Sequence, residues 1–142
     1  MSRLFIIDTN VLVAGLITGD AASPTAVILD TMLSGSLPYL LSPALLEEYR
    51  AVLLRPKLRR THGLTETQID TLLTEIVANA IWREPPNDAV HPAPDPGDDH
   101  LWALLANDSS CVLVTGDRLL LDNPRASSSV VSPSEYAHFF RH

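Results

Sequence analysis

Two acidic residues directly follow apolar segments that have the character of buried strands. Asp8 comes after residues 4–7, and Asp117 follows residues 112–115 after one glycine, in the motif VTGD. In open sheets of parallel strands, ligands bind beyond the carboxyl ends of the strands, so both carboxylates are expected at one edge. Each acid could instead simply cap the helix that follows it. Two acids at equivalent strand ends favour a binding site.

The neighbouring acids Glu47 and Glu48 are predicted to occupy different faces of one helix. If Ser42 caps that helix, the residues of its inward stripe are Leu45, Leu46, Tyr49, Val52 and Leu53. At about 100° per residue, Glu48 borders the stripe, whereas Glu47 points towards solvent. An unpaired buried charge is expensive, so Glu48 needs a partner; the alternative to a functional site is a salt bridge to Arg83 or Arg118.

A third acidic segment, DPGDDH at residues 95–100, opens a predicted helix. Helical spacing places Asp98 on the inner apolar face, Asp99 at its edge and His100 on the outer face. Asp95 precedes the turn and could reach the same place from the loop. Asp98 could instead be the N-cap and Asp99 a first-turn acid that complements the helix dipole. Helix capping would not explain why three acids crowd the start of this one helix.

Convergence of Asp8, Glu48, Asp98 and Asp117 would bring four negative charges together. At an effective dielectric constant near 20, two unit charges ~4 Å apart repel by about 4 kcal/mol. Either protonation or a divalent cation must relieve this repulsion. Ligation by oxygen alone suits Mg²⁺ or Mn²⁺ and disfavours zinc. Such a site could bind a phosphodiester, lower the pKa of bound water and stabilise the leaving oxygen.

Short apolar segments alternate with amphipathic segments along the chain. The predicted strands are residues 4–7, 37–41, 80–83, 112–115 and 130–131. Because they are apolar without alternation, they indicate a parallel sheet that is covered on both faces. The alternation of strands and helices therefore predicts an open α/β sandwich with right-handed crossovers.

Helix starts carry clear signals. Serine followed by proline suits an N-cap and a first helical position, and it occurs at residues 23–24, 42–43 and 132–133. Two capping boxes are predicted, formed by Thr65 with Gln68 and by Ser132 with Glu135. Two segments are predicted to be irregular, namely LRRTHG (58–63) and the proline-rich residues 83–99.

Composition limits the class of protein. The chain has 142 residues, of which 46% are hydrophobic and 19% are charged, as expected for one globular domain spanning residues 1–142. The single cysteine, Cys111, excludes an internal disulfide framework and fits a reducing compartment. The first apolar segment is too short for a membrane span or a signal-peptide core. A cytoplasmic protein without a membrane partner is therefore expected.

Basic and imidazole side chains give weaker signals. The net charge of −7 argues against a large basic surface for nucleic acid, unless carboxylates surround cations. The candidate phosphate contacts are Arg50, Arg55, Lys57 and Arg118, although the first three could equally belong to a solvated helix end. The histidines show no ligand-like spacing, and most are expected to be exposed; they are His62, His91, His100, His138 and His142.

Five segments in this order resemble a PIN domain, and more narrowly the toxin-antitoxin PIN nucleases related to VapC toxins. They are IIDTNVLVAGL, SPALLEEYRAVLLRPKL, DPGDDHLWALLA, VLVTGD and VVSPSEY. The resemblance covers nearly the whole chain. It implies a three-layer α/β/α sandwich with a five-stranded parallel sheet, and the second segment is expected to form one long helix.

The resemblance also implies an Mg²⁺- or Mn²⁺-dependent endoribonuclease. Its catalytic acids and metal ligands would be Asp8, Glu48, Asp98 and Asp117, with Asn10 and Thr115 as supporting polar groups. Asp8 and Asp98 would be the main ligands, Glu48 would ligate directly or through water, and Asp117 would complete the shell or hold a second ion. The implied partners are an RNA substrate, a cognate antitoxin and a second copy of the chain.

Two other functions are compatible with the same residues. A haloacid-dehalogenase-like phosphatase is suggested by VLVTGD, which resembles a strand ending in a phosphate-contacting threonine. That chemistry requires an acid two residues after the nucleophilic aspartate, where this chain has Asn10. The second alternative is a non-catalytic PIN-like module that binds RNA or protein.

Overall fold

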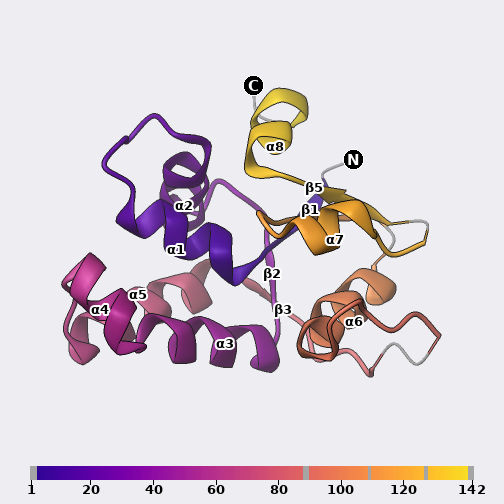
Figure 1. Ribbon diagram of the computed structural model, residues 1–142, viewed down its shortest axis with the longest axis horizontal. Coiled ribbons are helices and arrows are strands. Elements are labelled where there is room, and N and C mark those ends of the chain that lie inside the picture. Colours follow the sequence, from indigo (N-terminus) through magenta and orange to yellow (C-terminus); the bar gives the residue numbers. More distant parts are fainter. Residues whose placement is uncertain (1–2, 88–89, 109, 127, 141–142) are drawn as a thin grey trace.

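The computed structural model describes residues 3–87, 90–108, 110–126 and 128–140. Within them, parallel strands form two sheets (Figure 1). In the first sheet, β1 (Leu4–Ile7) pairs with β4 (Cys111–Val114), which pairs with β5 (Ser129–Val131). In the second, β2 (Leu40–Leu41) pairs with β3 (Ile81–Trp82). The predicted α/β class and parallel pairing are confirmed.

The expected single five-stranded sheet is instead divided between β1 and β2. The two strands meet through an isolated parallel bridge between Phe5 and Tyr39, and the Phe5 amide donates to the Pro38 carbonyl at 3.0 Å. Pro38 has no N–H group to donate, so it cannot extend the ladder, and β2 is only two residues long. The predicted strands 37–41 and 80–83 are correspondingly shortened.

Helices connect the strands. Their bounds are α1 Thr9–Ile17, α2 Pro24–Ser34, α3 Pro43–Leu53, α4 Pro56–His62, α5 Glu66–Asn79, α6 Asp99–Asn107, α7 Arg118–Asp122 and α8 Pro133–Phe139, with the 3-10 helix η1 at Pro96–Asp98. The three predicted Ser-Pro starts are confirmed at α2, α3 and α8. Both predicted capping boxes, at the starts of α5 and α8, are also present.

The expected long helix over residues 42–58 is wrong, because the chain breaks it into α3 and α4. Arg55 has an extended ψ of 131°. A residue before proline is biased away from the helical conformation, and Pro56 lacks the N–H that would continue α3. Pro56 then starts α4, so most of LRRTHG is helical rather than irregular, and Gly63, with φ of 70°, caps the C-terminus of α4.

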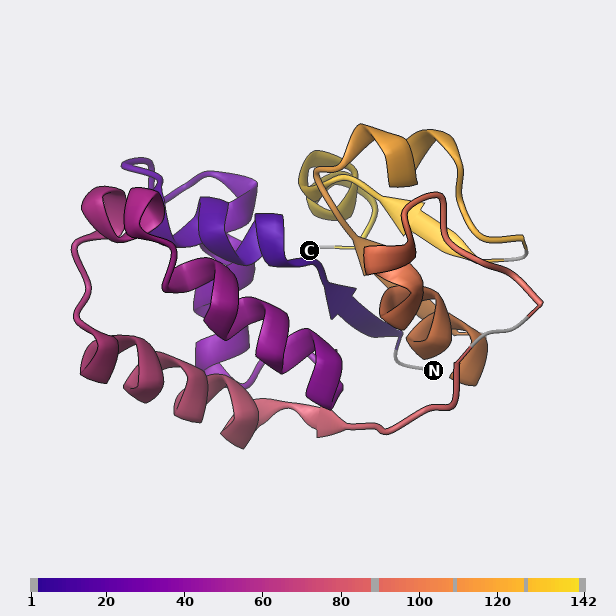
Figure 2. The same ribbon diagram turned by 60° about the horizontal axis from the view of Figure 1, so that its bottom comes forward.

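Helices lie on both sides of the strands. Figure 1 shows α2 and α8 on one side, and α3, α5 and α6 on the other. In Figure 2 the indigo strand β1 lies between α3 and α6, and these two helices contact each other. Ile6, Ile7 and Val114 are fully buried, and burying each such side chain contributes about 1.5–3 kcal/mol. The ends of β1 and β4 are therefore firmly fixed.

The described part of the chain contains no helix with the length and apolar character required to cross a membrane.

Candidate metal centre

A pocket of about 500 Å³ opens where β1 and β4 end. Five carboxylates line it, contributed by Asp8, Glu48, Asp95, Asp98 and Asp117. Arg55 also lines it, at the junction of α3 and α4. The pocket thus brings together acids that are up to 109 residues apart in sequence, with Asp8 and Asp117 at the extremes. The four predicted catalytic acids lie around one space.

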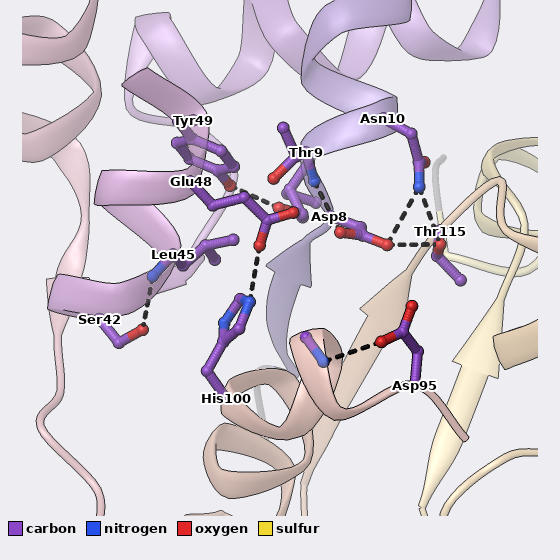
Figure 3. Close-up of polar contacts among 12 residues, drawn as sticks. Asp8, Thr9, Asn10, Ser42, Leu45, Glu48, Tyr49, Asp95, His100 and Thr115 are labelled. Carbon is purple, nitrogen blue, oxygen red and sulfur yellow. Dashed lines mark hydrogen bonds and ion pairs between the residues drawn. The ribbon is translucent and has the colours of Figure 1, made fainter. Parts of the chain in front are cut away.

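Asp8 is the most buried of these acids, with 3% of its surface exposed. Its Oδ1 accepts a hydrogen bond from the Thr9 amide at 2.8 Å. Its Oδ2 accepts from the Thr115 hydroxyl at 2.7 Å and from the Asn10 amide nitrogen at 3.0 Å (Figure 3). Burial raises the pKa of Asp8, although these hydrogen bonds oppose the increase. The carboxylate is therefore held in one orientation.

Asn10 and Thr115 link the end of β1 to the end of β4. The Asn10 side-chain oxygen accepts from the Gly116 amide at 2.8 Å, and its nitrogen donates to the Thr115 hydroxyl at 3.3 Å. The Thr115 hydroxyl accepts from the Asp117 amide at 3.0 Å. The two side chains thereby fix Asp8 and the backbone of Asp117 relative to each other.

Tyr49 positions Glu48 on α3. The Tyr49 hydroxyl donates to the carbonyl of Ile7, the residue before Asp8, and so fixes α3 against the end of β1 (Figure 3). Glu48 is half-buried and Glu47 is exposed, as the helical periodicity predicts. The hydrogen bond between Glu48 Oε2 and His100 Nε2, 2.6 Å long, is the main cause of a lowered pKa for Glu48. The partner of the Glu48 carboxylate is therefore His100, whereas Arg118 pairs with Asp122 and Arg83 donates to the Trp82 carbonyl.

The predicted outward, exposed position of His100 is wrong, because only 17% of its side chain is exposed. In a regular α-helix, residues two apart point about 200° away from each other. Asp98, however, lies in η1 with φ of −101° and ψ of 4°, outside the helical conformation. His100 and Asp98 therefore both reach the Glu48 carboxylate from the start of α6. The motif DPGDD suggests a 3-10 turn before the helix, and this turn was the sequence signal that could have placed His100 correctly.

Asp98 has the most unfavourable electrostatic environment of the cluster. Its pKa is raised to about 6, first by burial and then by the negative charges of Asp8, Glu48, Asp95 and Asp117. Asp98 occupies the N-cap position of α6, but its side chain makes no capping hydrogen bond. A helix-capping role, the alternative considered for Asp98, therefore does not explain the position of its carboxylate.

The other acids in and near the pocket also accept hydrogen bonds that stabilise the local backbone. Asp99 Oδ1 accepts from the Ala93 amide at 2.8 Å, and Asp95 Oδ1 accepts from the Gly97 amide at 2.9 Å (Figure 3). Asp117 caps α7 by accepting from the Leu119 amide at 2.9 Å, as Asp8 caps α1. A carboxylate oxygen has a second lone pair, so capping does not exclude metal binding.

The donor atoms fit a divalent cation. One ligand atom each from Glu48, Asp98 and His100 lies within 4.8 Å of the other two. Thr9 also lines the pocket, and only 4% of its surface is exposed. Its hydroxyl helps to lower the pKa of Glu48, but it makes no hydrogen bond of regular geometry with any described residue. A buried hydroxyl of this kind needs a partner, which water on a bound cation would supply.

The candidate phosphate contacts are dispersed. Arg55 lines the pocket. Arg50 instead bridges α3 and α5, with Nε 3.0 Å from Asp70 and Nη2 3.0 Å from Glu66. Arg118 pairs with Asp122 within α7, and Lys57 is exposed on α4. His142, one of the histidines considered above, lies outside the described residues.

Comparisons with known proteins identify the family. Among curated proteins, no sequence matches this chain. The family model described as "PIN domain" matches residues 5–119, which include every acid that lines the pocket. The match covers well over half of the sequence, and the parallel strands with acids at their carboxyl ends agree with it. The chain therefore belongs to the PIN domain family.

Proposed function

We propose that the protein is a metal-dependent endoribonuclease that hydrolyses RNA phosphodiester bonds. PIN domains are generally metal-dependent nucleases, which gives the reaction class. The observation that carries the proposal is the convergence of five carboxylates on one pocket, where burial and the neighbouring negative charges raise the pKa of Asp98 to about 6. A divalent cation, Mg²⁺ or Mn²⁺, is the partner that such a group of oxygen ligands favours.

Each pocket residue has a part in the proposed mechanism. A bound divalent cation would supply water activation and neutralise charge on the leaving oxygen. Asp8 and Asp98 would hold it, Glu48 would ligate or orient the attacking water, and Asp117 would complete the site. Asn10 and Thr115 keep Asp8 in place through hydrogen bonds of 3.0 and 2.7 Å.

Arg55 is the candidate contact for the substrate backbone. Its side chain lines the same pocket as the acids. A guanidinium group can donate to two phosphate oxygens at once, which would orient the RNA without reading its sequence. The acids carry the same negative charge as the phosphate and cannot hold it. A contact between Arg55 and a phosphate close to the cation would therefore fix the position of the scissile bond.

We also propose, from the resemblance alone, a biological setting for this activity. The protein would be the toxin of a toxin-antitoxin pair, would act in the cytoplasm and would form a homodimer. The apolar helix α2 does not supply evidence for the pairing, because it packs within the molecule against α1, α5 and α8. Light scattering of the purified protein, alone and with a neighbouring gene product, tests both associations.

The test of the proposed activity is cleavage of a mixed RNA pool by the purified protein. We expect cleavage with Mn²⁺, none with a chelator, and recovery when Mn²⁺ is restored. Asp8→Ala should remove the activity, whereas Glu47→Ala, an exposed acid on α3, should retain it. Turnover of phosphomonoesters without RNA cleavage would indicate a phosphatase. Binding of RNA or a protein without any turnover would indicate a non-catalytic module.

A further inference from the structure

His100 lies in the position of a metal ligand, although ligation by oxygen alone was expected. Its Nε2 is 2.6 Å from Glu48 Oε2, and one ligand atom each of His100, Glu48 and Asp98 lies within 4.8 Å of the other two. Atoms bound ~2.2 Å from one ion are at most about 4.4 Å apart. Side-chain adjustments of a few tenths of an ångström would therefore bring the three atoms around one ion.

The surroundings of His100 leave its ring available to an ion. Among the described residues, Glu48 is its hydrogen-bond partner, and His100 Nδ1 is buried without a partner. The short contact with Glu48 joins two groups through a proton, and a metal ion placed between them would take the place of that proton.

Thr9 gives an independent indication of a ligand at this position. Its hydroxyl points towards the Glu48 carboxylate in Figure 3 and helps to lower the pKa of Glu48, but it makes no hydrogen bond of regular geometry with any described residue, although Thr9 is 4% exposed. Leaving a buried hydroxyl without a well-formed hydrogen bond is unfavourable. Water in the coordination shell of an ion held by Glu48 would give the hydroxyl a partner.

We propose that His100 Nε2, together with the carboxylates of Glu48 and Asp98, binds a divalent transition-metal ion, and that this nitrogen makes the site select Mn²⁺ over Mg²⁺. Mg²⁺ prefers oxygen ligands and retains its water, whereas imidazole nitrogen binds transition metals better. The inference rests on the metal site of the proposed function but does not require RNA cleavage. It replaces the expectation of a site built from oxygen ligands alone.

The test is pulsed electron paramagnetic resonance of the full-length protein with Mn²⁺ alone at pH 7.5. Imidazole nitrogen bound to Mn²⁺ should modulate the spin echo, and the modulation should change when the protein is labelled with ¹⁵N-histidine. This measurement needs no variant, so a folding defect cannot mimic a negative result. Bound Mn²⁺ without a histidine nitrogen signal would overturn the proposal while leaving the proposed nuclease intact.

Affinity measurements separate ligation from mere support of Glu48. His100→Gln keeps a hydrogen-bond donor for Glu48 but removes the imidazole, and His138→Gln changes an exposed histidine on α8 as the matched control. We expect His100→Gln to lose roughly tenfold or more in Mn²⁺ affinity, with Mg²⁺ affinity almost unchanged. Equal losses for both ions would show that His100 only positions Glu48. Failure of the unaltered protein to bind any divalent ion would overturn the proposed function as well.

Discussion

Helix α3 has acidic clusters on two of its faces, and the surroundings of the negative charges differ between the two clusters. On the outer face, Arg50 lies between Glu66 and Asp70, and all three side chains are about half exposed. On the inner face, two residues earlier, Glu48 joins the carboxylates of the pocket. The outer cluster pairs acids with an arginine in water, whereas the inner cluster gathers acids beside one another in a partly buried place.

The difference indicates which cluster serves folding and which serves binding. Exposed ion pairs such as the Arg50 cluster contribute little to stability, since solvent screens both partners. Within the inner cluster, the ionised carboxylates of Asp8 and Asp98 oppose folding, because burial raises the pKa of both. Strongly perturbed carboxylates in a pocket are typical of functional sites. Substitutions of single residues in and around the two clusters test this difference.

The largest effect is expected from the adjacent pair Glu47 and Glu48. Glu48→Gln replaces a charged ligand with a neutral amide, and RNA cleavage should fall by at least about a hundredfold, since even outer-shell changes cost 10–100-fold. Glu47→Gln alters the exposed neighbour and should leave the rate unchanged. Single-turnover cleavage assays at saturating Mn²⁺ measure both. Equal losses in the two variants would contradict the assignment of Glu48.

The next effect concerns the hydroxyl that fixes α3 against β1. Tyr49→Phe removes the hydrogen bond to the Ile7 carbonyl, and Tyr49 is fully buried. The free energy of unfolding should fall by about 1–3 kcal/mol, because the carbonyl loses its partner. Urea denaturation measures this loss. An unchanged midpoint would show that the carbonyl is satisfied in another way.

Asp98→Asn should stabilise the metal-free protein. The pKa of Asp98 is about 6 in the folded state, against 3.8 for an unperturbed aspartate, so its ionisation costs folding energy as the pH rises through that interval. At pH 7.5 the gain should be about 1 kcal/mol after allowance for solvent screening, and it should vanish below pH 4. Thermal melts across this range measure it.

Excess Mn²⁺ should make the unaltered protein more stable than Asp98→Asn, because the unaltered protein gains stability from binding and the variant does not. If the variant is less stable than the unaltered protein even without metal, the carboxylate is a structural group rather than a ligand.

The sequence signals that proved reliable are local. Ser-Pro pairs and capping boxes predict helix starts, since a cap depends on residues within one turn. Helical periodicity separates the exposed Glu47 from the half-buried Glu48 for the same reason. The positions of Asp8 and Asp117 at strand ends follow from the rule that parallel strands share one carboxyl edge.

The missed features depend on contacts between distant segments or on one proline. Pro56 divides the expected long helix, and Pro38 limits the pairing of β1 with β2. His100 was assigned to the wrong face because a helical projection of α6 alone contains neither η1 nor the packing of α3 against α6. Thr9 gave no signal at all, since an unpaired hydroxyl is visible only in the folded chain.

The smallest effect is expected from the two arginines on α3 and at its end. Arg55→Ala removes a cation that lines the pocket, so RNA affinity should fall a few-fold. The salt dependence of binding should also decrease by the equivalent of about one phosphate contact. Arg50→Ala, whose guanidinium is held by Glu66 and Asp70, should leave RNA affinity unchanged. Fluorescence anisotropy with a non-cleaved RNA analogue compares them, and a larger loss for Arg50→Ala would reverse the assignment.

The most direct measurement is anomalous diffraction from crystals soaked in Mn²⁺ at pH 7.5. The pocket should show a Mn²⁺ peak among the carboxylates of Asp8, Glu48, Asp98 and Asp117, about 2.2 Å from the oxygens that ligate it. A pocket that stays free of Mn²⁺ at saturating concentration, with its acids held only by protons and hydrogen bonds, would contradict the cation as the reason for their convergence.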